Sequence, residues 1–252
     1  PAAEESIRIM ADQFPDMLLG AGTVLTTEQA DRAIAAGAKF IVSPGFNPKV
    51  VSHCIEKNIP ITPGISSPSD MEQAIEMGLD AVKFFPAVPS GGLSMIKALA
   101  APYHTMRFMP TGGVTPQNLT EFLDYPKILA CGGTWMVKPE LLATGNFEEI
   151  TRLTRQTVRT MLDLKIDELT LPFPHTGNNL SDALHGLINL SSGSTKELTI
   201  SCRYLKRTIY HLEKNGATFR YDNAKYDSTG NMDAIDFSDT PEEFSIRLIE
   251  KH

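Results

Sequence analysis

The 252-residue sequence is 42% hydrophobic and 21% charged, which is ordinary for a globular protein and leaves room for one large domain or two smaller ones. Its net charge of -7 argues against binding to nucleic acids or anionic membranes, because both need a basic surface. The three cysteines are widely spaced and no apolar stretch reaches the roughly 20 residues of a membrane span, so we expect a cytoplasmic protein without a disulfide framework.

Residues 1 to about 162 repeat one pattern, in which a helical segment is followed by a short apolar run. Runs that are apolar on both faces and alternate with amphipathic helices predict parallel strands covered by helices. Clear helical patterns occupy 27–38 and 67–78, and Ser69 is the predicted N-cap of the second. The six predicted strands lie in 17–25, 40–45, 59–64, 81–87, 107–113 and 127–133.

Small or turn-forming residues follow all six predicted strands at their carboxyl ends. Two α/β architectures fit such a sequence, a doubly wound sheet and a (β/α)8 TIM barrel. In a barrel every strand end contributes to the active site, whereas an open sheet uses the switch point, so the pattern favours the barrel. Because a barrel has eight strands, the sequence predicts a barrel that lacks its first one to two β/α units, with roughly 40 to 50 residues preceding Pro1.

The strand–helix alternation stops after Leu162, and a different order of elements follows. A helical pattern is present near 180–188, and a second predicted helix covers 203–216. The last part has the order βαβββ, typical of a small α+β domain, with its final strands in 217–222, 232–237 and 243–250. We therefore predict two domains, residues 1–163 and 164–252.

Lys83 stands inside the apolar run 81–87, where a charged group is unexpected. Most lysines in such places lay the stem on the core and keep the ammonium in water or in a salt bridge. If the side chain instead points into the barrel, burial lowers the pKa and makes the amine a nucleophile toward a carbonyl. The resulting imine of a 2-keto acid stabilises a carbanion without a metal or cofactor. Lys83 is therefore the candidate catalytic residue.

Paired glycines follow two late strands of the predicted barrel. Thr115 and Pro116 predict a helix that starts directly after the first pair. Glycine-rich exits of consecutive late strands commonly form the phosphate site of a barrel, although tight turns explain them equally well. The residues of the two loops are Thr111, Gly112 and Gly113, and Gly132, Gly133 and Thr134.

Six motifs, in this order and spacing, resemble the class I aldolase family that acts on 2-dehydro-3-deoxy-6-phosphogluconate (KDPG) and 4-hydroxy-2-oxoglutarate (KHG). These motifs are GAGTVL, SPGFNP, TPGISSPSD, KFFPA, PTGGV and GGTW. The resemblance implies a (β/α)8 barrel, usually a homotrimer, with a small 2-keto acid or phosphorylated sugar acid as substrate. Such enzymes cleave KDPG to pyruvate and glyceraldehyde 3-phosphate, or KHG to pyruvate and glyoxylate.

The same resemblance implies Lys83 as the Schiff-base lysine. A glutamate that acts as general acid and base, and an arginine that binds substrate, would lie before Pro1. The implied substrate-binding residues are Thr23, Pro44, Phe85 and Thr111 around the pyruvate moiety, and Gly112, Gly113, Gly132, Gly133 and Thr134, the last in place of a typical serine, around the phosphate.

The C-terminal segment resembles, more weakly, half-modules of the glyoxalase/bleomycin-resistance type. His175 matches an early metal ligand of that family, but Glu197 and Arg247 occupy the other expected ligand positions, so we expect no metal site. Two further interpretations of the whole chain remain open. One is a phosphate-binding barrel isomerase without a lysine nucleophile, and the other is a catalytically inactive protein that senses a ligand.

Overall fold

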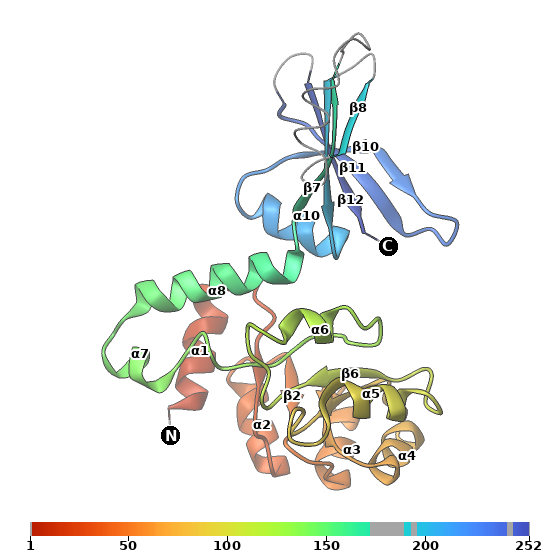
Figure 1. Ribbon diagram of the computed structural model, residues 1–252. Helices are drawn as coiled ribbons and strands as arrows, with labels where there is room; N and C mark the ends of the chain where they lie inside the picture. The colour runs from red at the N-terminus through yellow and green to blue at the C-terminus, as the bar shows by residue number, and fades with distance from the viewer. Residues whose placement is uncertain (1, 172–188, 193–195, 241–243, 252) are drawn as a thin grey trace. The chain divides into compact units, whose positions relative to one another are not determined.

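The computed structural model describes residues 2–171, 189–192, 196–240 and 244–251. The chain forms two compact units, Pro1–Gly145 and Asn146–His252 (Figure 1). Helix α8 (Phe147–Leu162) belongs to the second unit, so the division falls before this helix, whereas the sequence predicted a boundary after it. The end of α8 is fixed within that unit because the Arg203 guanidinium donates to the carbonyl groups of Thr160 and Met161.

The strands of the first unit are parallel and pair in the order of the sequence. They form two three-stranded sheets, β1-β2-β3 and β4-β5-β6. Only Pro63 separates β3 from β4, and its carbonyl group accepts a hydrogen bond from the backbone N–H of Lys83 at 2.9 Å. The strands are β1 (Gly20–Ala21), β2 (Phe40–Val42), β3 (Ile61–Thr62), β4 (Gly64–Ile65), β5 (Ala81–Phe84) and β6 (Arg107–Pro110).

The predicted strand at 127–133 is present only as two isolated parallel bridges, Phe108 with Ile128 and Thr111 with Gly132. These bridges extend the second sheet by one more segment in sequence order. A doubly wound sheet reverses its strand order at the switch point. The described strands of this unit show no such reversal, so the doubly wound alternative does not fit them.

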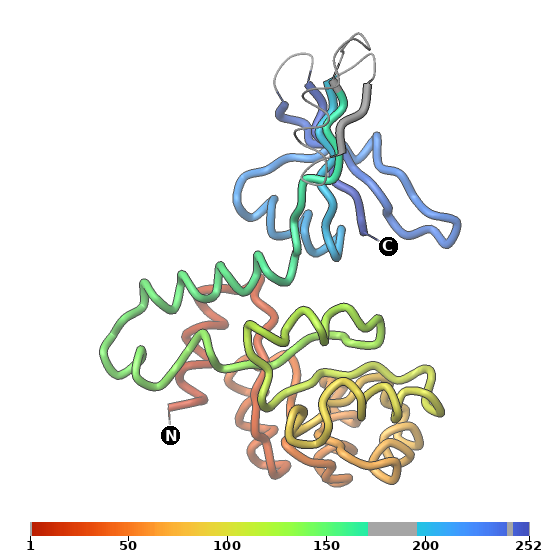
Figure 2. Tube along the Cα trace, viewed as in Figure 1, coloured from red at the N-terminus to blue at the C-terminus, as the bar shows by residue number. Residues whose placement is uncertain are grey.

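Helices alternate with these strands, as the chain trace in Figure 2 shows. The Thr26 and Asn47 side chains cap α2 and α3. The predicted N-cap Ser69 is wrong, because Ser67 caps α4 and forms a capping box with Asp70. The helices are α1 (Ala3–Gln13), α2 (Thr27–Ala35), α3 (Pro48–Glu56), α4 (Pro68–Glu76), α5 (Gly92–Ala100), α6 (Leu119–Leu123) and α7 (Pro139–Ala143).

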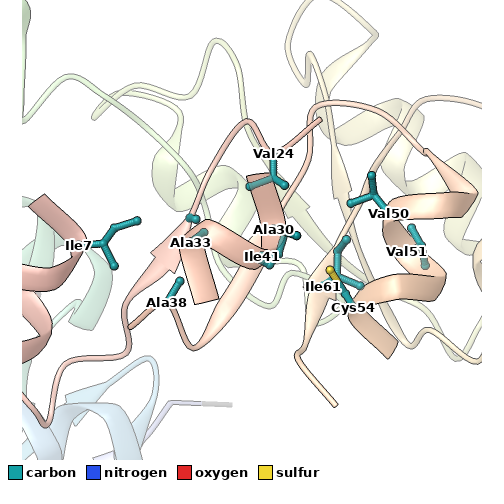
Figure 3. Close-up of a cluster of buried hydrophobic side chains, with 11 residues drawn as sticks. Ile7, Val24, Ala30, Ala33, Ala38, Ile41, Val50, Val51, Cys54 and Ile61 are labelled. Carbon is teal, nitrogen blue, oxygen red and sulfur yellow. The ribbon is translucent and has the colours of Figure 1, made fainter. Parts of the chain in front are cut away.

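One face of the first sheet packs against the helices. Ile41 of β2 and Ile61 of β3 are buried in a cluster with Val51 and Cys54 of α3 (Figure 3). Because successive side chains of a strand point to opposite faces, Thr62 points away from this cluster. The face opposite this cluster is therefore the one that can carry polar groups.

The second unit contains a six-stranded sheet in the order β10-β11-β12-β9-β7-β8. Helix α10 (Leu205–Glu213) packs Leu205 and Ile209 against Ile235 and Leu248 of this sheet. The segment from β9 to β12 has the predicted βαβββ order, and β7 and β8 join the same sheet. The strands are β7 (Lys165–Leu171), β8 (Asn189–Ser192), β9 (Lys196–Cys202), β10 (Phe219–Tyr226), β11 (Met232–Phe237) and β12 (Phe244–Glu250).

Glu197 and Arg247, which stand where the resemblance would expect metal ligands, bind each other in this sheet. Arg247 lies 3.0 Å from Glu197 and 2.8 Å from Asp236, so its guanidinium occupies the space between both carboxylates. His175 and the predicted helix near 180–188 lie outside the described residues. Within the described ranges, no helix is both long and apolar enough to cross a bilayer.

Candidate active site

Lys83 lies on β5 and is only 7% exposed, although it carries an amine. Its neighbours Val82 and Phe84 are fully buried. The Lys83 Nζ lies 4.4 Å from the centroid of the Phe85 ring. Among the described residues no carboxylate lies within ion-pair distance of this amine, so burial alone lowers its pKa. The interpretation as a solvated or salt-bridged lysine is therefore wrong.

We expect Lys83 to form imines at a pH at which ordinary lysines are still protonated. Burial lowers its pKa below the ordinary value of 10.5, so the neutral, nucleophilic amine becomes abundant at lower pH. The rate of borohydride-trapped adduct formation with pyruvate, measured between about pH 6 and pH 10, should rise to a midpoint below the ordinary lysine pKa. A midpoint at or above 10.5 would contradict the assignment.

The same shift links Lys83 to stability. Between the lowered folded pKa and the ordinary value of 10.5, the unfolded chain binds more protons than the folded chain. The free energy of unfolding is therefore highest above the unfolded pKa of 10.5. It decreases as the pH falls from there through the lowered folded pKa, because the folded chain then holds a buried, charged amine.

Pro44 is placed next to the Lys83 strand by a close backbone contact. In the ladder between β4 and β5, Gly64 pairs with Lys83, so both residues face the same side of the sheet. A Cβ atom on Gly64 would overlap the carbonyl group of Pro44. The loop that contains Pro44 thus covers the sheet directly beside Lys83, and it can do so only because residue 64 lacks a side chain.

Thr111 reaches the same face from the other side. Met109 of β6 pairs with Lys83, and Thr111 lies two residues further along the strand direction, so its side chain shares the Lys83 face. Thr111 also forms a parallel bridge with Gly132, where a Cβ atom would lie 2.5 Å from the Thr111 hydroxyl oxygen. Gly132 therefore permits the close approach of the second glycine loop.

The first glycine loop lies against Phe85. Gly112 and Gly113 both adopt positive φ angles, 94° and 84°, which favour glycine. A Cβ atom on Gly112 would lie 3.2 Å from the Phe85 ring. Consecutive glycines in this conformation leave backbone N–H groups available for an anion. The loop is therefore shaped to lie beside the aromatic ring that contacts the lysine.

The predicted helix start at Thr115 and Pro116 is wrong. Helix α6 begins at Leu119, with Asn118 as its N-cap. The Asn118 side chain instead holds the loop, because it accepts from the Thr115 N–H at 2.8 Å and donates to the Gly113 carbonyl group at 3.1 Å. An Asn–backbone bridge, and not a helix N-terminus, thus fixes the conformation of this loop.

Thr23 and Thr134 lie in exposed loops, and within the described ranges no hydrogen bond joins either of them to Lys83. Thr134 follows the second glycine pair, whereas Thr23 follows β1. The Thr23 backbone has a φ of 59°, which is strained for a β-branched residue. Strain of this kind concentrates at functional sites, so it supports Thr23 as a site residue.

We expect replacement of Thr23 by glycine to stabilise the fold and weaken substrate binding. Glycine adopts the positive φ without the steric cost of about 1–2 kcal/mol, and this gain exceeds the entropy of about 0.5–1 kcal/mol that glycine loses on folding. The free energy of unfolding should therefore rise by about 0.5–1 kcal/mol. Urea unfolding measures this gain, and pyruvate trapping on the same variant measures the loss of the hydroxyl. A destabilised variant with unchanged trapping would contradict both parts.

Two residues of this face escaped the sequence analysis, Gly64 and Thr62. Gly64 belongs to the motif TPGISSPSD, but its contact with Pro44 depends on tertiary structure. Thr62 precedes Pro63 in the same motif. Its position next to the apolar Ile61, which is buried on the helix side, was the sequence signal that Thr62 faces the other side.

Comparison with known proteins decides the family. Residues 1–153 match the family model described as KDPG and KHG aldolase. The chain belongs to the KDPG and KHG aldolase family. The KDPG/KHG resemblance predicted from the six motifs is thus confirmed, and the match ends within α8, so it covers the first unit and the start of the second.

Curated members of the KDPG and KHG aldolase family are similar to the chain over the same region. The 2-dehydro-3-deoxy-phosphogluconate aldolase of Treponema pallidum is 52% identical over 157 residues, which is 62% of this chain and 75% of that protein. The KHG/KDPG aldolase of Escherichia coli strain K12 is 38% identical over 156 residues, covering 62% of this chain and 73% of that protein.

Solved structures of KDPG aldolases also resemble the chain. One is the Legionella pneumophila enzyme with pyruvate captured as a covalent carbinolamine intermediate. It is 36% identical, its TM-score is 0.60, and the match covers 62% of this chain and 76% of that chain. Another is the Zymomonas mobilis enzyme with 3-phosphoglycerate, with 38% identity, a TM-score of 0.57 and coverage of 62% and 73%.

Proposed function

We propose that this chain is a class I aldolase that cleaves KDPG to pyruvate and glyceraldehyde 3-phosphate, KHG to pyruvate and glyoxylate, or both. The observation that carries the proposal is the buried amine of Lys83, whose lowered pKa makes it a nucleophile. Its support is the related Legionella aldolase that holds pyruvate as a covalent carbinolamine. An isomerase that binds phosphate without a lysine nucleophile would not need this amine.

The reaction follows from the chemistry of the amine. The lone pair of neutral Lys83 attacks the C2 carbonyl, and the carbinolamine loses water to give a protonated imine. The C4 hydroxyl then loses its proton to water as the bond between C3 and C4 breaks. The electron pair of that bond moves into the imine, and C4 leaves as the aldehyde. Protonation at C3 of the remaining enamine and attack by water on the imine release pyruvate and restore the amine.

The loops around Lys83 supply the binding groups in this proposal. Phe85 lies against the amine. Thr111 follows the neighbouring strand β6, and the loop that contains Pro44 lies against Gly64, the partner of Lys83 in the ladder. Thr23 completes the set around the pyruvate moiety. The residues proposed to bind the phosphate, or the distal carboxylate of KHG, are Gly112, Gly113, Gly132, Gly133 and Thr134.

We further propose that the parallel strands of the first unit are part of a (β/α)8 barrel, in keeping with their sequential order. A homotrimeric, cytoplasmic enzyme is our expectation for the assembly and location. Three free cysteines agree with a reducing compartment. Mass measurement of the native assembly tests the trimer. The division into an aldolase domain and a glyoxalase-like α+β domain also remains a proposal, and the match to the family model ends at residue 153.

Borohydride reduction in the presence of pyruvate tests the proposed function. The expected result is a reduced pyruvyl adduct that peptide mass spectrometry maps to Lys83, and none without pyruvate. Cleavage assays with KDPG and KHG, coupled to pyruvate detection, then rank the two substrates. An unmodified Lys83 under conditions that label a known aldolase would refute the imine mechanism.

A further inference from the structure

Thr62 faces the same side of the sheet as the catalytic lysine. Its neighbour Ile61 is 5% exposed and packs into the helix-side cluster, so alternation directs Thr62 to the opposite side. Gly64 lies two residues further along and shares that side, and it pairs with Lys83 in the ladder. Thr62 therefore lies at the end of β3, one residue before the carbonyl group that binds the Lys83 N–H, and on the Lys83 face.

The hydroxyl group of Thr62 is buried but makes no hydrogen bond within the described residues, and the same is true of Thr111. Buried hydroxyls are nearly always paired, because an unpaired one costs folding free energy. Thr62 directly precedes Pro63, whose carbonyl group accepts from the Lys83 N–H, and Thr111 directly follows β6, which pairs with β5 on its other side. Two unpaired hydroxyls thus flank the strand that carries the nucleophile.

We propose that Thr62 is a further substrate-binding residue, whose hydroxyl donates a hydrogen bond to an oxygen of the 2-keto acid bound to Lys83. This inference rests on the proposed function, because it needs an adduct on that amine. A 2-keto acid bound to Lys83 has carboxylate oxygens, and its carbinolamine adds a hydroxyl group. These oxygens can accept hydrogen bonds from both Thr62 and Thr111. Bound substrate would pair the hydroxyl that the free protein leaves unpaired.

The test compares the wild-type chain with Thr62→Val and Thr62→Ser in borohydride trapping at increasing pyruvate concentrations. Valine keeps the shape and removes the hydroxyl, so the half-saturating pyruvate concentration should rise about tenfold, the effect of one hydrogen bond. The thermal midpoint without pyruvate should stay or rise, because an unpaired polar group is removed. Serine keeps the hydroxyl and should restore most of the affinity.

Thr208→Val serves as the matched control, because Thr208 is a fully buried threonine in the second unit, and it should leave the pyruvate dependence unchanged. Wild-type pyruvate dependence in Thr62→Val, or an equal loss in Thr62→Ser, would overturn the Thr62 assignment while the aldolase proposal stands. A Thr62→Val variant that shifts the pH midpoint of trapping, but not its pyruvate dependence, would also overturn it. An absence of any Lys83 adduct on the wild-type chain would overturn both proposals.

Discussion

Replacement of Lys83 by methionine should abolish the pyruvate adduct and lower the cleavage rate by on the order of 10³-fold or more, because no covalent intermediate can form. Methionine fills a similar volume without a polar group. Since the amine is 7% exposed and forms no ion pair with the described residues, its removal should also raise the thermal midpoint. Steady-state cleavage assays and thermal unfolding measure the two effects.

Lys97→Met is the control for this substitution. Lys97 is exposed on α5, and its amine also lies over an aromatic ring, that of Tyr125 at 5.6 Å. Its replacement should change neither the adduct nor the rate. If Lys83→Met retained the wild-type rate, or if both variants lost activity equally, the assignment of the nucleophile would be wrong.

Replacement of Gly64 by alanine should destabilise the first unit by about 3 kcal/mol and impair adduct formation on Lys83. The new methyl group would overlap the backbone carbonyl of Pro44, and a backbone cannot rotate out of the way as a side chain can. Either the Pro44 loop or the β4–β5 pairing must shift, and both lie beside the amine. Urea unfolding and pyruvate trapping measure the two losses.

Gly45→Ala provides the comparison within the same loop. A Cβ atom on Gly45 would have no heavy atom within 4 Å, and its backbone needs no positive φ. This variant should unfold at nearly the wild-type urea concentration. Equal stability of Gly64→Ala and Gly45→Ala would show that the contact with Pro44 does not constrain the fold.

Periodicity predicted the parallel strand–helix order of the first unit because each strand there is apolar and each helix amphipathic. Lys83 could be found because an amine in an apolar run contradicts its surroundings. Thr62 could not be singled out in the same way, since a threonine on a strand is unremarkable until the burial of its hydroxyl is known. Gly64 depends on the tertiary approach of Pro44, which no local pattern encodes.

Helix starts were predicted less well, for two different reasons. Ser67 and Ser69 both suit an N-cap, and each has an acidic residue three positions later. Only Ser67 is followed directly by a proline, which favours the first helical position, so Pro68 was the available signal. At Thr115 and Pro116 the local signal for a helix is genuine. The Asn118 side chain overrides it by bonding the backbone at both ends of the turn.

The hydrogen bond between the Lys83 backbone and Pro63 allows the opening of β5 to be measured. The N–H of Lys83 donates to the Pro63 carbonyl group, and proline has no N–H of its own to offer the ladder. This amide therefore joins β5 to the point where one sheet passes into the other. Its hydrogen-exchange rate reports how often the strand beneath the nucleophile opens, a property of the resting enzyme that no turnover assay detects.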